Sequence, residues 1–238
     1  MTAKQFQSTQ WSVVRQAARA DDAAARAALV SLCERYWYPI YAFLRRKGVA
    51  PERAEDVTQG FFARLIEKRV LEQADPARGR FRSFLLTAVQ NFLANERDYT
   101  TAQKRGGGRA VLSLDAEAGE SRLSVEPAHA LTPEKLFDRA WAFHVLELVV
   151  ERLRTEFVVA GKATEFEVLR PFLAGRHASA SYEETAASLG RSATALRQAA
   201  HRLRDRYRVL LRAEVGETVS GEDEVEDEIR GLFAALAG

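Results

Sequence analysis

The stretch SYEETAASLGRSATALRQAAHRLRDRYRVLL, residues 181–211, decides the fold of the C-terminal half of the chain. Ser181 followed by Glu184 has the form of a capping box, in which a hydroxyl and a carboxylate each satisfy a free backbone amide at a helix start. Gly190 permits a tight turn, and Ser192 caps a following helix. The stretch therefore predicts two helices joined by a short turn.

The second predicted helix has an apolar and a basic face. The apolar side chains, at helical spacing, are Leu196, Ala200, Leu203, Tyr207 and Leu210. The polar and basic side chains that point largely the other way are Arg197, Gln198, His201, Arg202 and Arg204. A recognition helix packs on one side and enters the major groove with the other. An arginine-rich helix facing only solvent is the alternative, and the caps and turn favour DNA binding.

The remaining sequence also shows helical rather than strand spacing. Amphipathic helices are predicted at residues 11–20, 23–47, 51–68, 81–99, from Pro133 onward and at 164–174. Gly48 is expected to end the second of these, and Pro51 to begin the third. The sequence therefore predicts an all-α fold.

Three consecutive glycines in QKRGGGR, residues 103–109, and the polar residues after them predict a break between two domains. We expect a first small helical domain at residues 1–102 and a flexible linker at 103–132. A second helical domain is expected at 133–213, followed by an acidic, amphipathic C-terminal tail at 214–238.

Composition excludes several classes of protein. The chain has 238 residues, with 35 basic and 33 acidic side chains, as in an ordinary globular protein. Cys33, the single cysteine, is expected to be a buried thiol. The four histidines are scattered, so no metal site or cofactor is expected. No apolar run is long enough to span a bilayer and the N-terminus lacks a signal-peptide core, so a cytoplasmic location is expected.

Residues 181–211 resemble the promoter-reading helix-turn-helix of extracytoplasmic-function (ECF) sigma factors, in which Ser-Tyr-Glu-Glu, a Leu-Gly turn and a basic helix with His-Arg are typical. The resemblance implies a region 4-like domain that reads the minus-thirty-five element of promoter DNA. It assigns this contact to Ser192, Thr194, Arg197, Gln198, His201 and Arg202. Ala199 stands where many members have arginine, which implies one missing DNA contact.

The N-terminal half resembles the same family. Residues 54–65, AEDVTQGFFARL, are similar to the helix that binds core RNA polymerase. The resemblance implies a region 2-like helical bundle and assigns polymerase binding to Glu55, Asp56, Gln59, Phe61 and Arg64. The protein is then a sigma factor, not an enzyme, and a monomer when free.

Residues 80–97, RFRSFLLTAVQNFLANER, are similar to the family's helix that opens the minus-ten element and holds flipped bases of the single strand. The matching residues are Arg80, Arg82, Ser83, Asn91, Asn95 and Arg97. The loop Asp75–Gly79 is expected to form the base pocket, Phe84 and Phe92 to lie in the core, and Lys104, Arg105 and Arg109 to contact phosphates.

Two departures from the family pattern bear on regulation. Arg53 and Gly60 stand where the polymerase-binding helix often has acids. Phosphorylation of Thr58 by a Ser/Thr kinase would add about −1.5 to −2 charges there; the alternative is that Thr58 is only a small helix residue. An anti-sigma factor is a second candidate regulator.

The C-terminal tail is the other departure. Its acids, at residues 222–228, are predicted to fold back on the arginine-rich helix and weaken promoter binding. A disordered, solubilising tail is the alternative.

Three other functions stay open. A helix-turn-helix regulator that never engages polymerase would explain residues 181–211 alone. An enzyme is the second alternative, but the sequence contains no recognisable catalytic set or phosphate-binding loop. An inactive sigma-like scaffold would fit the loss of acids at Arg53 and Gly60.

Overall fold

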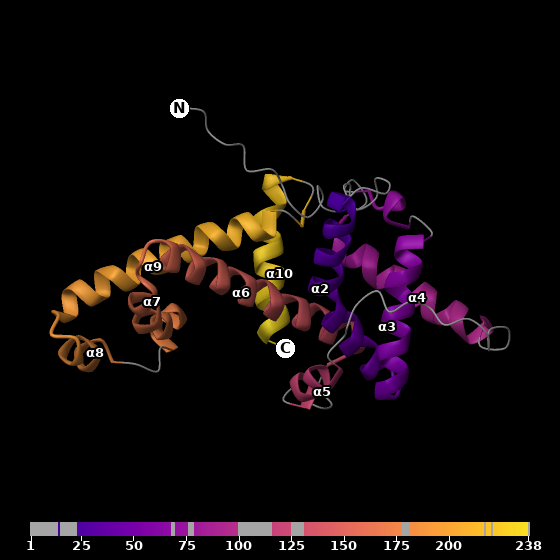
Figure 1. The fold of residues 1–238 in the computed structure, drawn as a ribbon, viewed down its shortest axis with the longest axis horizontal. Coiled ribbons are helices and arrows are strands. Elements are labelled where there is room, and N and C mark those ends of the chain that lie inside the picture. The colour runs from indigo at the N-terminus through magenta and orange to yellow at the C-terminus, as the bar shows by residue number, and fades with distance from the viewer. Residues whose placement is uncertain are drawn as a thin grey trace. The chain divides into compact units, whose positions relative to one another are not determined.

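The computed structural model describes residues 14, 23–67, 70–75, 79–99, 116–124, 131–177, 181–216, 218–219 and 221–237. Throughout these residues the regular structure is helical, as predicted (Figure 1). None of the helices in these ranges has the length and apolar character needed to cross a membrane. Of the predicted helix at 11–20 only residue 14 is described, and the triple glycine lies outside the described residues.

The chain forms two compact units. The first contains residues 1–144 and 215–238, and the second contains residues 145–214. This division differs from the predicted domains, because the boundary lies inside a helix and the C-terminal tail belongs with the N-terminal unit.

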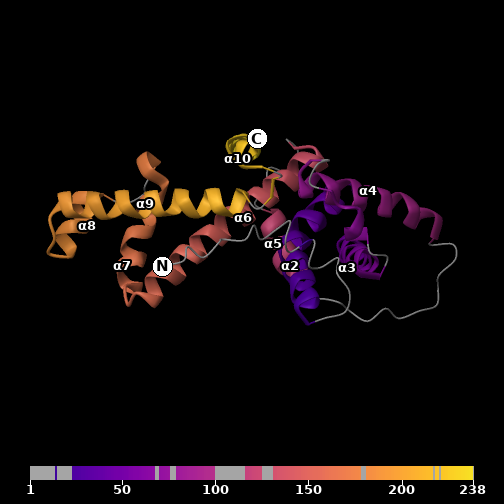
Figure 2. The ribbon, with the colours of Figure 1, turned by 90° about the horizontal axis from the view of Figure 1, so that it is seen from above.

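Three helices form the centre of the first unit: α2 (Ala23–Arg46), α3 (Pro51–Glu67) and α4 (Phe81–Tyr99) (Figure 2). Their bounds lie within one residue of the predicted ones. Gly48, with φ of 84°, ends α2, and the N–H of Val49 donates to Leu44 O at 3.1 Å. This is a Schellman turn, which needs the left-handed conformation that glycine adopts without strain.

The core of these helices follows the predicted apolar spacing. The fully buried side chains include Tyr36, Ile40, Phe43, Leu44, Val57, Phe61, Phe62, Leu65, Phe81, Leu85 and Val89. Phe84 and Phe92, expected in the core, are only partly buried. The short 3₁₀ helix η1 (Val70–Gln73) joins α3 to the loop before α4.

A helix interrupts the predicted linker. Helix α5 (Ala116–Ser124) packs against α2 because Gly119 lets its backbone approach closely: a Cβ there would lie 3.2 Å from Tyr41. Glu120 accepts hydrogen bonds from Tyr41 Oη (2.7 Å) and Arg45 Nε (2.6 Å). The sequence reasoning missed α5, since its stability comes from these contacts rather than from an apolar face of its own.

Helix α6 (Pro133–Val159) begins at the predicted proline and belongs to both units. In the first unit, Leu136 and Ala140 of α6 pack with Tyr38 and Ala42 of α2. Arg46 donates to Leu131 O at 2.8 Å. These contacts attach the start of α6 to the N-terminal helices.

The C-terminal tail is helical from η4 (Glu222–Glu224) through α10 (Val225–Ala237). Val225, Glu228 and Leu232 are buried, at one-turn intervals along one face. Arg139 of α6 donates to Leu236 O. The described part of the tail therefore packs within the first unit, so the alternative of a disordered tail does not fit it. The predicted fold-back on the arginine-rich helix is also wrong for Glu228, which contacts Arg80 and Arg82 of the N-terminal helices instead.

The second unit contains the end of α6, α7 (Ala163–Leu169), the 3₁₀ helix η3 (Arg170–His177), α8 (Tyr182–Ser188) and α9 (Ala193–Gly216) as far as residue 214. Pro171 opens the predicted helix at 164–174 into 3₁₀ form, since proline cannot donate a backbone hydrogen bond. Arg206 of α9 donates to Glu156 of α6 at 2.8 Å, and Arg152 pairs with the buried Glu214 at 2.7 Å.

Burial shifts the pKa of Cys33 and of His144 in the first unit. Cys33 is buried, as predicted, and burial followed by the charge of Glu34 raises the pKa of its thiol to about 12. Burial, followed by the charges of Arg35 and Arg122, lowers the pKa of His144 from 6.5 to about 4. His144 Nε2 is buried and has no hydrogen-bond partner among the described residues, so the neutral ring is the stable form.

We expect the stability of the protein to fall as the pH drops from about 6.5 to about 4. In that window the unfolded chain binds a proton at residue 144 and the folded chain does not, so the unfolded state gains up to about 3 kcal/mol. Chemical denaturation across this range should show a steeper loss for the wild type than for His144→Leu. Equal slopes for the two proteins would contradict the assignment.

Candidate nucleic-acid interface

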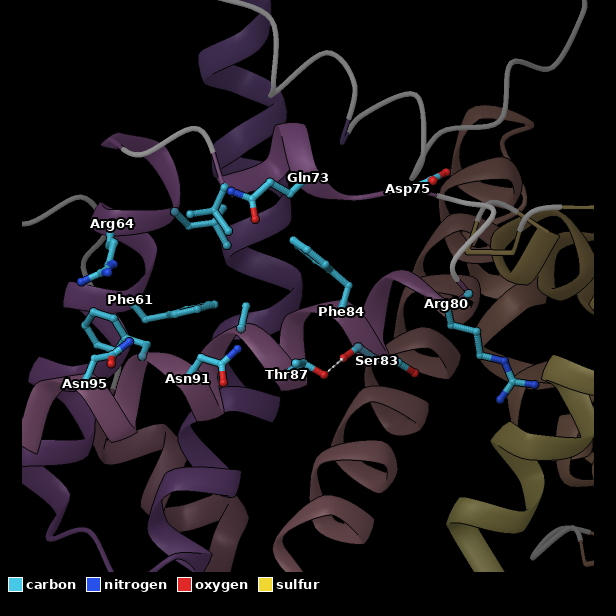
Figure 3. Close-up of a pocket in the computed structure, with 15 residues that line it drawn as sticks. Phe61, Arg64, Gln73, Asp75, Arg80, Ser83, Phe84, Thr87, Asn91 and Asn95 are labelled. Atoms are coloured by element: carbon cyan, nitrogen blue, oxygen red, sulfur yellow. Dashed lines mark hydrogen bonds between the residues drawn. The ribbon is translucent and has the colours of Figure 1, made fainter.

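A cavity of about 480 Å³ opens on the first unit between α3 and α4 (Figure 3). Its lining side chains come from the second half of α3, from η1, from the following loop and from one face of α4. They are Phe61, Arg64, Leu65, Val70, Gln73, Asp75, Gly79, Arg80, Ser83, Phe84, Thr87, Ala88, Asn91, Phe92 and Asn95.

The walls of this cavity combine aromatic and polar groups. Phe61 packs edge-on against Phe92 with ring centroids 5.8 Å apart, and Phe84 reaches into the cavity from α4. The Arg64 guanidinium lies 5.8 Å from the centre of the Phe92 ring. Aromatic faces beside amide and guanidinium donors are the groups that hold an unstacked base and its phosphate.

The structure brings four of the six predicted minus-ten residues, Arg80, Ser83, Asn91 and Asn95, to this cavity. Arg97 lies in α4, and its side chain is outside the described residues. Of the predicted base-pocket loop, Asp75 and Gly79 line the cavity, and residues 76–78 are not described. Lys104, Arg105 and Arg109 are also outside the described part.

Arg82 has a different environment from these four residues. Its side chain is buried among α4, α6 and α10, where it donates to both carboxylate oxygens of Glu228, at 2.9 and 3.0 Å, and to Asp138. The guanidinium also lies 4.6 Å from the centre of the Trp141 ring. Burial opposes the charge, but Glu228 and Asp138 raise the pKa of Arg82 overall. Arg82 cannot reach an external ligand in this conformation.

The predicted polymerase-binding residues divide between two locations. Asp56 is exposed on α3, and Glu55, half-buried, accepts a hydrogen bond from Gln59 at 3.2 Å. Phe61 and Arg64, one to three turns later, instead line the cavity. The structure therefore groups Glu55, Asp56 and Gln59 and separates them from the other two.

Thr58 is completely buried, and its hydroxyl donates to Ala54 O at 2.6 Å. A kinase needs an exposed hydroxyl, so Thr58 is not a substrate in this conformation. The observed environment is that of a small side chain within the helix core.

In the second unit, α8 and α9 form the predicted hairpin (Figure 1). Ser181 Oγ accepts from the N–H of Glu184 at 3.4 Å, and Ser192 Oγ accepts from the N–H of Ala195 at 3.2 Å. Gly190 has a φ of 61° and begins a Schellman turn in which the N–H of Arg191 donates to Ala186 O at 2.9 Å. These local bonds set the angle at which α9 leaves the turn.

All six predicted minus-thirty-five residues, Ser192, Thr194, Arg197, Gln198, His201 and Arg202, are exposed. Arg197 pairs with Glu183 of α8 and lies over the Tyr182 ring, and His201 Nδ1 is 2.6 Å from Asp205 Oδ2. The opposite side of α9 buries Leu196, Ala200 and Leu203.

Two side chains of α9 differ from the sequence interpretation. Arg204 faces inward and donates to Phe172 O (3.1 Å) and Tyr182 Oη (3.0 Å), so it holds α9 to η3 and α8. Ala199 is only 9% exposed, so its small side chain removes nothing from the exposed basic face. Both residues lie at the border between the buried and the exposed face of α9, and helical spacing alone does not predict toward which face such a side chain points.

The sequence reasoning also missed Gln73 and Thr87 in the cavity and Glu228 on α10. Glu228 did carry a signal, because it occupies an apolar-face position between Val225 and Leu232. Comparison of the chain with protein-family models, curated proteins and solved structures finds no match.

We expect Gly190→Ala to destabilise the second unit by roughly 1–2 kcal/mol, the cost of placing a Cβ in a left-handed conformation. No heavy atom lies within 4 Å of the added Cβ, so the cost comes from the backbone alone. Gly190→Asn should lose less, since asparagine tolerates this conformation. Thermal unfolding measures both, and equal losses would contradict the backbone explanation.

Proposed function

We propose that this chain is a sigma factor of the ECF type, which binds core RNA polymerase in the cytoplasm and directs promoter recognition, DNA melting and transcription initiation. In this proposal the two compact units correspond to region 2-like and region 4-like domains. The observation that carries the proposal is the cavity between α3 and α4, because residues selected only by sequence resemblance line it together with aromatic side chains.

The cavity suits a single-stranded base better than duplex DNA. Its volume of about 480 Å³ admits a base, and Phe84 and Phe92 offer ring surfaces for stacking. Asn91 and Asn95 are exposed on the adjacent turns of α4 and can hydrogen-bond a base edge. Arg80 at the rim can contact the phosphate that carries the base.

The α8–α9 hairpin suits duplex DNA. Arg197, Gln198 and Arg202 are exposed on one helix and have the side chains that bind base edges and phosphates in a major groove. Arg204 and the buried leucines support that helix from behind. This hairpin equally supports the alternative of a helix-turn-helix regulator that does not engage polymerase.

Polymerase binding separates the two functions. Asp56→Arg should weaken binding to core RNA polymerase from the source organism roughly tenfold or more, because it reverses the charge of an exposed acid in the proposed interface. A pull-down or a titration of labelled chain measures this.

Glu167→Arg is the matched control, since it makes the same charge change at an exposed helix position of the second unit. It should bind like the wild type. Equal weakening in both variants would place the interface elsewhere, and the absence of polymerase binding by the wild type would favour the DNA-binding regulator.

Single-strand capture is tested by Asn91→Ala. We expect the complex with polymerase to bind a fluorescent single-stranded oligonucleotide roughly fivefold or more weakly, because a hydrogen-bonding group is lost at the cavity. Gln90→Ala is the control: Gln90 is the adjacent amide on α4, and it bonds Glu134 at 3.3 Å outside the cavity. A larger effect of Gln90→Ala than of Asn91→Ala would contradict the cavity assignment.

A further inference from the structure

The contact between α10 and α4 places an acid of the tail on arginines beside the cavity. Glu228 has no exposed side-chain surface, although its neighbours Asp227 and Glu226 on the same helix are exposed. One carboxylate oxygen lies 2.8 Å from Arg80 Nε, and both accept from Arg82. A single acid of the tail thus pairs with two arginines that are 146 and 148 positions earlier in the chain.

Arg80 belongs to both sites at once. It lines the cavity, and Figure 3 shows its guanidinium extending from the cavity rim toward the ribbon of α10. Its side chain stays 37% exposed while paired with Glu228. A ligand in the cavity can therefore approach the guanidinium that the tail already contacts.

We propose that α10 is an internal competitor of nucleic acid: Glu228 occupies the place of a DNA phosphate on Arg80 and Arg82, and α10 must leave this surface for full single-strand binding. This inference rests on the proposed function of the cavity. The released surface would present Arg80, Arg82 and the Trp141 ring, a set that fits a phosphate and an adjoining base.

Charge and burial explain why docking of α10 and binding of nucleic acid at Arg80 and Arg82 exclude each other. Guanidinium groups bind carboxylates and phosphates through the same pair of N–H donors, so one arginine cannot hold both fully. The acids at residues 222–224 and 226–227, all exposed on η4 and α10, add repulsion toward a polyanion while the tail is docked. Arg82 is 8% exposed and becomes accessible only when α10 moves.

The docked state can also be reversed. Apart from its ion pairs, α10 is held by the hydrogen bond from Arg139 to Leu236 O and by apolar side chains, of which Val225 and Leu232 are buried. In released α10, Glu228 becomes hydrated, so its charge does not remain buried without a partner. In the DNA-bound state, phosphates replace the carboxylate on the two arginines, and Asp138 stays beside Arg82. In each state, every charge is therefore either paired or hydrated, which is the condition for a two-state switch.

The test compares Glu228→Gln with Asp227→Asn in the full-length chain, using a fluorescent single-stranded oligonucleotide and anisotropy at low and moderate salt. Glu228→Gln keeps the shape of the side chain and removes its charge. We expect it to raise the affinity roughly fivefold or more. Asp227 pairs with Arg230 on its own helix, so Asp227→Asn removes the same charge from α10 without touching α4 and should raise the affinity much less than Glu228→Gln does.

Each outcome has a distinct meaning. Equal gains in both variants would show a general charge effect, and no gain in Glu228→Gln with normal wild-type binding would refute the competition while leaving single-strand capture intact. If no version binds the oligonucleotide, alone or with polymerase, the capture function fails and the competition with it.

Hydrogen exchange provides a second test, which uses only the wild-type protein and so does not depend on the folding of a variant. Amides of α10 should exchange faster in the presence of the oligonucleotide, because the ligand displaces the helix. Unchanged or slower exchange there, with the oligonucleotide bound, would overturn the proposal.

Discussion

The Arg82 guanidinium lies where three helices of the first unit meet, and the arrangement of that unit depends on how its charge is satisfied. Glu228 binds it from α10, Asp138 from α6, and the Trp141 ring covers one face. A buried ion left without a partner costs several kcal/mol. The first and last parts of the chain are therefore coupled by one buried charge, and the tail is an integral part of the N-terminal unit.

Helix α4, which carries Arg82, has a face that packs in the core and another that lines the cavity. Phe81, Leu85 and Val89 fill the core, which holds the helix against α2 and α3. The next face carries Ser83 and Asn91 into the cavity, where the helix core keeps them in position. Arg80 lies at the border between the cavity and the α10 contact, so the cavity and the tail share an electrostatic group.

The hairpin of the second unit is built differently, from bonds that are local in sequence. Serine caps and a glycine turn set the path of α8 and α9, and Arg204 ties α9 to the backbone of Phe172. The exposed side chains between these supports stay accessible. Under the proposed function, this preformed basic helix binds a duplex without rearrangement, whereas the surface under α10 has to be uncovered first.

The helices could be predicted from the sequence, because their apolar spacing, caps and breaker residues act within a few positions. The bounds of α2, α3 and α4 were predicted to within one residue, and the turn between α8 and α9 was also predicted, although α9 extends beyond residue 211 to Gly216. The resemblance also assigned six residues of α4 and its start to one site, and four of them, Arg80, Ser83, Asn91 and Asn95, line the same cavity. Only the tertiary structure decided the place of α5, the inward direction of Arg204, and the burial of Thr58 and Arg82. These depend on partners that are distant in the chain, such as Glu228 for Arg82, 146 positions away. No local pattern of spacing or charge specifies which buried acid meets which arginine.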